Sequence, residues 1–246
     1  TGTGGLILLN NFYETWKPGI SIEYITGSYG LHNIFTAARF GQEARLNDVV
    51  GQENKNQLTF AHNQTDGYRV QTSMRRDNFS WTSQLKREKH ELTAALLFTD
   101  MYYQTPGALT LAEFKNDPKA ARPAGGGFPS AVNAKAAIYQ KNLLVGISNL
   151  FRIAPGFKNT TTLYGAYARI KNPAIRNYEK RTEPSFGGRS VFSLDKKMEN
   201  RTMNFVAGAE FQQGYFNTQV SKNRNGEPDT LQTDDDIDNK MLSLFV

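Results

Sequence analysis

Arginine and aromatic side chains gather in the polar stretches of this 246-residue chain, and together they suit recognition of anions. Arg75 and Arg76 follow the turn signal Asp66-Gly67, and a second basic group lies within residues 176–189. A guanidinium group presents planar, forked donors that match carboxylate or phosphate oxygens. The interleaved aromatic residues are Tyr102, Tyr103, Phe114, Phe128, Tyr178 and Phe186. These stretches predict a surface that binds an anionic ligand with an organic part. A solvated basic loop is the alternative for each single residue.

The three histidines do not form a catalytic or metal site in sequence. His90-Glu91 begins like the zinc-protease motif H-E-x-x-H, but Ala94 stands where the second histidine is required. His32 and His62 stand alone in strand-like stretches, so we expect structural roles for them. Phosphate-binding loops, dinucleotide fingerprints and the nucleophile elbow are missing from the sequence. We therefore expect no enzymatic activity, no metal site and no cofactor.

An acidic run near the end of the chain resembles a calcium loop only in part. Asp234, Asp236 and Asp238 have the required spacing, but Asn239 replaces the turn glycine and Phe245 the bidentate glutamate. This excludes an EF-hand. A calcium site in an irregular loop stays open beside the simpler alternative of a solvated loop.

Composition favours a sheet that has one polar face. Hydrophobic residues make up 39% of the chain, below the roughly 45–50% of an average soluble domain, while aromatics reach 12% and glycines number 21. The absence of cysteine excludes disulfides and thiolate metal sites. The net charge of +6 is scattered rather than concentrated in a stripe, so we expect no binding to nucleic acid. The longest apolar runs, GLILL and AALLF, are too short for a transmembrane helix.

Alternation with a period of two recurs along the chain and predicts β-strands. It is clearest in GISIEYITG, HNIFTAARF, LTFAHNQ, NFSWTSQL, ELTAALLF and TMNFVAGAEFQ. In the last of these, Phe205, Ala207 and Ala209 share one face while Asn204 and Glu210 share the other. IYQKNLLVGIS and TTTLYGAYARI are strand-like but less cleanly sorted, and LTLAEFKND predicts a short turn of helix. The chain is therefore expected to be all-β.

The lengths of the connections predict at which end of the sheet each of them lies. Short polar turns are expected at 86–90, 154–159 and 199–201, and long loops at 104–136, 171–189 and 222–238. In an antiparallel sheet, this alternation would place every long loop at one end, as in a transmembrane β-barrel. The stretch 42–57 is longer than this scheme expects.

Several segments resemble the barrel of TonB-dependent outer-membrane receptors, especially the siderophore-receptor type of Bacteroidota. They are DGYRVQTSMRRDNF, YYQTPGALTLAEFKNDPKAARPA and KNPAIRNYEKRTEPSFGGRSVF. TGTGGLILLN is similar to the end of the plug domain of such receptors, and GSYG to a short first extracellular hairpin. The resemblance implies that residues 1–11 end a plug and that residues 12–246 form the N-terminal part of the barrel. About ten strands of an antiparallel, 22-stranded transmembrane barrel would be present, so we expect the chain to be a fragment.

The resemblance implies a transporter of the bacterial outer membrane and not an enzyme. It would bind and import an iron-siderophore or another small molecule, coupled to TonB through an N-terminal segment absent from this sequence, and outer-membrane lipid would surround it. Arginines would hold anionic oxygens of an iron chelate while tyrosines pack its organic part. The candidate ligand-binding residues are Arg75, Arg76, Tyr103, Gln104, Arg176 and Arg181. Two alternatives stay open: an importer of glycans or peptides, and a soluble β-sandwich that binds a partner.

Overall fold

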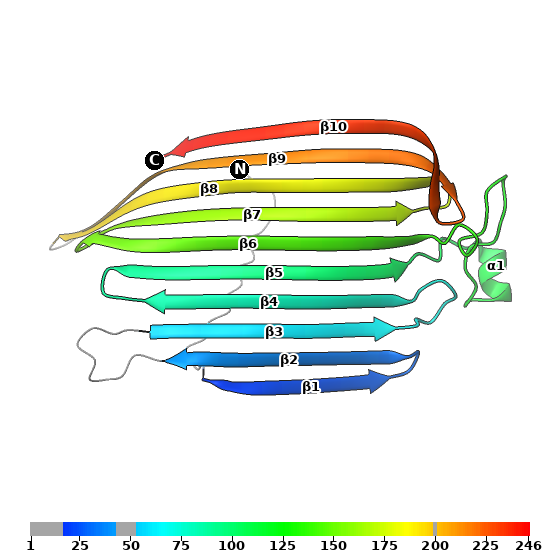
Figure 1. The fold of residues 1–246 in the computed structure, drawn as a ribbon, viewed down its shortest axis with the longest axis horizontal. Helices are drawn as coiled ribbons and strands as arrows, with labels where there is room; N and C mark the ends of the chain where they lie inside the picture. The colour runs from blue at the N-terminus through cyan, green and yellow to red at the C-terminus, as the bar shows by residue number, and fades with distance from the viewer. Residues whose placement is uncertain (1–16, 43–52, 199–200) are drawn as a thin grey trace.

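Ten strands form one antiparallel sheet in the part of the chain that the computed structural model describes, residues 17–42, 53–198 and 201–246 (Figure 1). Each strand pairs with its neighbours in sequence, and the sheet is open between its first and last strands. The strands are β1 (Gly19–Gly27), β2 (Leu31–Gln42), β3 (Glu53–Thr65), β4 (Met74–Lys86), β5 (His90–Gln104), β6 (Ala137–Ala154), β7 (Phe157–Pro173), β8 (Asn177–Met198), β9 (Arg201–Arg224) and β10 (Glu227–Phe245). The expected all-β, antiparallel architecture of about ten strands is confirmed.

The register joins the faces of the individual strands into two continuous surfaces. Leu96 on β5 lies opposite Trp81 on β4 and Val145 on β6, and the same alignment continues across the sheet. One side, the apolar-band face, carries Ile22, Phe60, Phe79, Leu96, Val145, Leu163, Phe186, Phe211 and Leu242. The other side, the polar face, carries Glu23, Thr59, Ser80, Thr93, Asn142, Thr162, Ser185, Gln212 and Ser243. In the six stretches where alternation was clear, on β1–β5 and β9, it predicted both faces correctly.

The apolar-band face has no second sheet over it in the described residues. Ile20 is 80% exposed, Ile22 74% and Leu244 78%. A soluble sandwich would bury such a face against another sheet about 10 Å away. The single sheet therefore does not have the architecture of the β-sandwich alternative.

The predictions of long loops at 171–189 and 222–238 are wrong. Residues 171–189 belong almost entirely to β7 and β8, which a turn at 174–176 connects. Residues 222–238 belong to β9 and β10, which meet at Asn225-Gly226 with φ of 53° and 89°. Asn-Gly in this conformation forms a tight hairpin. Most residues on both faces of these strand ends are polar, so their sequence lacks the apolar alternation that predicts a strand. Lys180, Arg181 and Arg189 therefore lie on β8, and the run 234–238 lies on β10 rather than in a loop.

The connection 105–136 is the long loop that was expected, and it folds into a compact lobe beyond the ends of the strands (Figure 1). It contains α1 (Leu111–Asn116), the predicted helical turn, and a small core of Ala131, Ala134 and Ala136. Thr110 caps α1 because its hydroxyl accepts from the N–H of Glu113 while the Glu113 carboxylate accepts from the N–H of Thr110. No helix in the described residues has the length and hydropathy that crossing a membrane requires.

The short turns expected at 86–90 and 154–159 are confirmed as 87–89 and 155–156. The third, at 199–201, and the long stretch at 42–57 fall partly outside the described residues, although β3 already begins at Glu53. The predicted plug segment, residues 1–11, also lies outside them.

Candidate functional site

Aromatic pairs flank the apolar band at both of its ends. Toward the lobe, the rings of Tyr102 and Tyr139 lie 4.7 Å apart. Toward the short turns, His90 and Phe151 lie 4.6 Å apart, and a similar pair joins β7 to β8. Tyr139 and Phe151 are both on β6, so the pairs are separated by about 40 Å along the strand. At a strand tilt of about 45° this becomes nearly 30 Å, close to the roughly 25 Å band of a transmembrane barrel.

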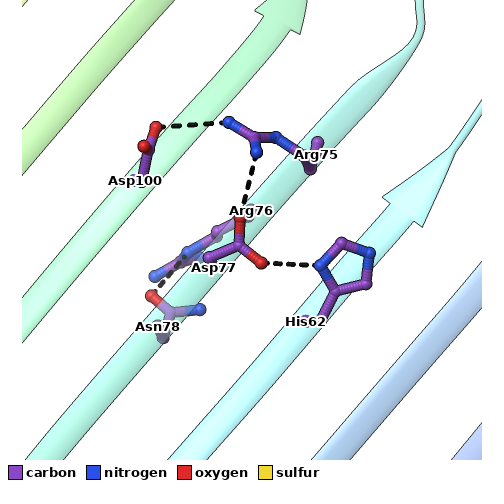
Figure 2. Close-up of polar contacts among 6 residues, drawn as sticks. All are labelled: His62, Arg75, Arg76, Asp77, Asn78 and Asp100. Carbon is purple, nitrogen blue, oxygen red and sulfur yellow. Dashed lines mark hydrogen bonds and ion pairs between the residues drawn. The ribbon is translucent and has the colours of Figure 1, made fainter.

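A row of charged side chains lies on the same face, at the lobe end of the apolar band. Figure 2 shows His62, Arg75, Asp77 and Asp100 of this row. Arg75 bridges Asp77 and Asp100, at 3.4 Å from each carboxylate. His62 Nδ1 lies 2.6 Å from Asp77, and Lys141 Nζ lies 2.9 Å from Asp100. These groups are partly exposed, so each pair contributes little to stability. The row instead marks where the surface changes from apolar to charged.

Arg76 and Tyr103 lie together on the polar face. Arg76 is opposite Met101, and Tyr103 is two residues farther along the same side of β5. The Arg76 Nε donates to Asn78 Oδ1 at 3.1 Å, and Thr99 donates to the same oxygen at 3.0 Å. Asn78 therefore holds one edge of the guanidinium group, and its terminal nitrogens make no hydrogen bond to the described residues.

Neighbouring residues on a strand point to opposite faces of the sheet. The adjacent candidate residues Arg75 and Arg76, and likewise Tyr103 and Gln104, are therefore on different faces. Arg75 lies on the apolar-band face and Arg76 on the polar face (Figure 2). Gln104 likewise lies on the face opposite to Tyr103. Its side-chain oxygen accepts from the Ser73 hydroxyl at 2.8 Å and from the Ser73 N–H at 3.3 Å. Gln104 thus fastens the end of β4 to the end of β5.

The two arginines predicted farther along the chain differ in their surroundings. Arg181 lies on the polar face of β8, between Glu179 at 3.2 Å and Glu183 at 3.5 Å. Arg176 lies in the turn 174–176, where its guanidinium carbon is 3.9 Å from the centre of the Phe128 ring. Arg176 therefore ties this turn to the lobe, and Arg181 shares the polar face with Arg76 four strands away.

The lobe is held by side chains that bond to its backbone. The Arg69 guanidinium donates to the carbonyls of Ala120 and Gly107 at 2.9–3.1 Å. Asn223, near the tip of β9, donates to the carbonyls of Ala134 at 2.8 Å and Ala174 at 2.6 Å. Sequence reasoning did not single out Asn223, and no local pattern could have done so because its partners are 89 and 49 residues away.

Metal ligands do not come together in residues 17–42, 53–198 and 201–246: no group of three or more His, Asp or Glu could hold an ion there. The aspartates of β10 accept hydrogen bonds instead. Asn217 donates to Asp234 and Asp236, and the Tyr215 hydroxyl donates to Asp236 at 2.6 Å. Their arrangement on an exposed strand is that of a solvated polar ladder.

Comparison with known proteins shows a likeness in fold. No family model matches the chain, and no curated protein sequence matches it. Among solved structures, the chain is similar to the ferric citrate transporter FecA in its unliganded form, with a TM-score of 0.66 and 13% identity. The match covers 92% of this chain and 33% of the transporter chain, so this chain spans about a third of that length. The ten strands therefore have the fold of part of an antiparallel transmembrane β-barrel of the kind found in this transporter.

Proposed function

We propose that the chain is part of an outer-membrane transporter that binds and imports a ferric siderophore-like ligand with energy coupling through TonB. The two-faced sheet is the observation that carries this proposal. Its apolar-band face, flanked by aromatic pairs, suits contact with lipid, and its polar face suits the lumen of a large barrel. The fold likeness to a ferric citrate transporter supports a small anionic iron complex as the class of ligand.

The polar face supplies the groups that such a ligand requires. Arg76 and Arg181 present forked donors on this face, and Tyr103 adds a phenol ring beside Arg76. An iron chelate that carries carboxylates would accept hydrogen bonds from the arginines and pack against the ring. Transport of this kind forms no covalent bond, so the proposed protein is not an enzyme.

The opposed faces of Arg75 and Arg76 provide a matched test in the full-length protein. Binding of ferric citrate can be followed by quenching of intrinsic fluorescence, and iron uptake by labelled iron in cells that lack other routes. We expect Arg76→Gln to weaken ferric citrate binding about tenfold or more, as loss of a charged hydrogen bond does. Arg75→Gln, at the neighbouring position on the other face, should leave the affinity within about twofold.

Each possible result of the binding and uptake measurements tests a different part of the proposal. Equal losses in both variants would keep Arg75 in the site and contradict the assignment by face. Normal binding in both would remove the pair from the site. Uptake that persists without TonB would contradict energy coupling whatever the affinity.

A glycan or peptide importer is the second candidate, and one observation favours it. Tyr29 and Tyr68, each 50% exposed, form an edge-to-face pair 5.6 Å apart at the lobe end of the sheet. Exposed aromatic rings are suitable platforms for sugar or peptide stacking. Saturable binding of oligosaccharides that Tyr68→Ala abolishes, with no response to ferric citrate, would support this candidate over iron import.

A further inference from the structure

The apolar-band face of β4–β7 contains a shallow apolar recess. Its lining includes Trp81, Ala94, Leu96, Val145, Leu163 and Gly165. The recess forms because Ala94 and Gly165 are small, whereas the residues around them are large. A side chain added at Gly165 would point into it, since its Cβ would meet Val145 Cγ2 at 3.8 Å. The apolar lining of this hollow suits an alkyl chain.

A basic groove lies on the same face of the same four strands, nearer the lobe. It is lined by Arg75, Asp100, Tyr139, Lys141, Arg169 and Lys171. Arg75 and Lys141 are neutralised in part by Asp77 and Asp100. Arg169 and Lys171 make no ion pair with any residue of the described chain. Four cations against two carboxylates leave the groove positive.

The register of β7 and β8 gives a further reason for an anion to bind in this groove. Lys171 on β7 lies directly opposite Lys180 on β8. Like charges at opposed positions of neighbouring strands destabilise a sheet. An anion held between these lysines and Arg169 would remove that repulsion, and a phosphate group has the charge and the oxygens to do so.

The recess and the groove are aligned along the strands. Gly165 and Arg169 on β7, and Val145 and Lys141 on β6, are each four residues apart, or about 13 Å. A row of apolar and aromatic side chains separates the two hollows on this face: Phe79, Phe98, Leu143 and Tyr167. An amphiphile with a phosphate head and an alkyl chain matches both the order and the spacing.

We propose that the outer surface of β4–β7 is a specific binding site for a phosphate-bearing lipid. The phosphate would lie against Arg169 and Lys171, and an acyl chain would fill the recess around Gly165. This site lies on the opposite side of the sheet from Arg76 and Tyr103, so it goes beyond the proposed import function. It requires only that the apolar-band face contacts the membrane.

Lipid retention by the full-length protein tests the site. The protein is exchanged into mixed micelles that contain equal amounts of dioleoyl phosphatidic acid and dioleoyl phosphatidylcholine, and bound lipids are counted by native mass spectrometry. We expect the wild type to retain phosphatidic acid selectively. Arg169→Gln with Lys171→Gln should weaken this retention about tenfold or more, since each basic residue near a lipid surface contributes appreciably.

A matched control removes the same residue types from the same two strands. Arg152 and Lys158 lie opposite each other at the other end of β6 and β7, on the polar face. Arg152→Gln with Lys158→Gln should leave retention within about twofold. Equal retention in the two double variants would overturn the proposal.

A second pair of variants distinguishes a lipid from free phosphate. Gly165→Leu fills the recess, whereas Ala166→Leu places the same side chain on the polar face. We expect the first to lower retention severalfold and the second to leave it unchanged. Unchanged retention in Gly165→Leu, together with displacement of the lipid by millimolar inorganic phosphate, would show an anion site without a lipid and would overturn the acyl-chain assignment.

Discussion

Leu144 and Val145 are neighbours on β6, yet they lie on opposite faces of the sheet. Their exposed fractions are nearly equal, at 45% and 41%. Their surroundings differ: Asn142 and Gly146 flank Leu144 on the polar face, whereas Leu143 and Ile147 flank Val145 within the apolar band. The exposed fraction alone therefore does not distinguish a residue that suits contact with lipid from one that suits contact with water. The rows of side chains on each face do, because a continuous apolar row suits lipid and an interrupted one suits water.

The largest expected effect comes from placing an arginine on each face in turn. Val145→Arg puts a charge in the middle of the apolar band, which we expect to cost about 2–4 kcal/mol of folding free energy in a bilayer. Leu144→Arg should change the stability by less than about 1 kcal/mol because its side chain stays on the polar face, beside Asn142, where it can reach water. Urea unfolding of the full-length protein in phospholipid vesicles measures both. Equal losses would show that lipid does not distinguish the two faces.

Two adjacent glycines on β8 sharpen the same comparison. A Cβ at Gly187 would lie 2.5 Å from the Tyr164 hydroxyl and 2.7 Å from the Phe211 carbonyl oxygen, on the polar face. A Cβ at Gly188 would meet the end of the Leu163 side chain at 2.8 Å, which can rotate away. We expect Gly187→Ala to cost about 1–3 kcal/mol and Gly188→Ala less than 1 kcal/mol. The same vesicle unfolding assay checks both, and a reversed order would contradict the packing described for Tyr164.

Tyr102 and Tyr103 extend the comparison to the end of the band. Tyr102 packs against Tyr139 with its ring tilted, so Tyr102→Ala should lower stability by about 1 kcal/mol while leaving ferric citrate binding intact. Tyr103→Ala, on the face of Arg76, should weaken ferric citrate binding severalfold with a smaller loss of stability. Unfolding and binding measured on both variants would show whether the two roles follow the two faces. Loss of binding in Tyr102→Ala alone would contradict this division.

Sequence periodicity was sufficient to predict the strands within the band but not their extensions beyond it. In ELTAALLF, the apolar residues at every second position all lie on the apolar-band face, so the pattern predicts the strand and its face. In EKRTEPSFGG, on β8, both sides are polar, and the same backbone was mistaken for a loop. The dipeptide Asn225-Gly226 was the signal that could have corrected the β9–β10 connection, since it marks a two-residue hairpin.

The sequence supplied the residue types for the candidate ligand site but not the faces on which these residues lie. Arg75, Arg76, Tyr103 and Gln104 were chosen for their chemistry near the strand ends, whereas alternation places consecutive residues on opposite faces. Gln104 accepts a hydrogen bond from Ser73, which lies 31 positions away in the sequence. Its role therefore depends on a distant residue. Contacts of such range, like that of Asn223 with the lobe, arise from the assembled sheet and leave no local pattern.

The smallest effect on stability is expected in the lobe. The lobe lies beyond the ends of the strands, so a change there should not depend on which face of the sheet meets lipid. Hydrogen bonds from the N–H and hydroxyl of Thr110 lower the pKa of Glu113 below its ordinary value of 4.5. Because the folded pKa is the lower one, this stabilisation is complete above pH 4.5 and is lost as the pH falls through the folded value.

Hydrogen exchange of residues 111–116, corrected for the intrinsic rate at each pH, should therefore show protection that declines only below pH 4.5. Thr110→Ala removes the cap and should raise exchange at neutral pH about fivefold. It should also reduce the acid dependence in part, since the hydroxyl bond to Glu113 is gone while the bond from the backbone N–H of residue 110 remains. The variant should leave urea unfolding in vesicles unchanged, because the cap touches neither face of the sheet. A matching loss in unfolding stability would instead show that the lobe folds as one unit with the strands below it.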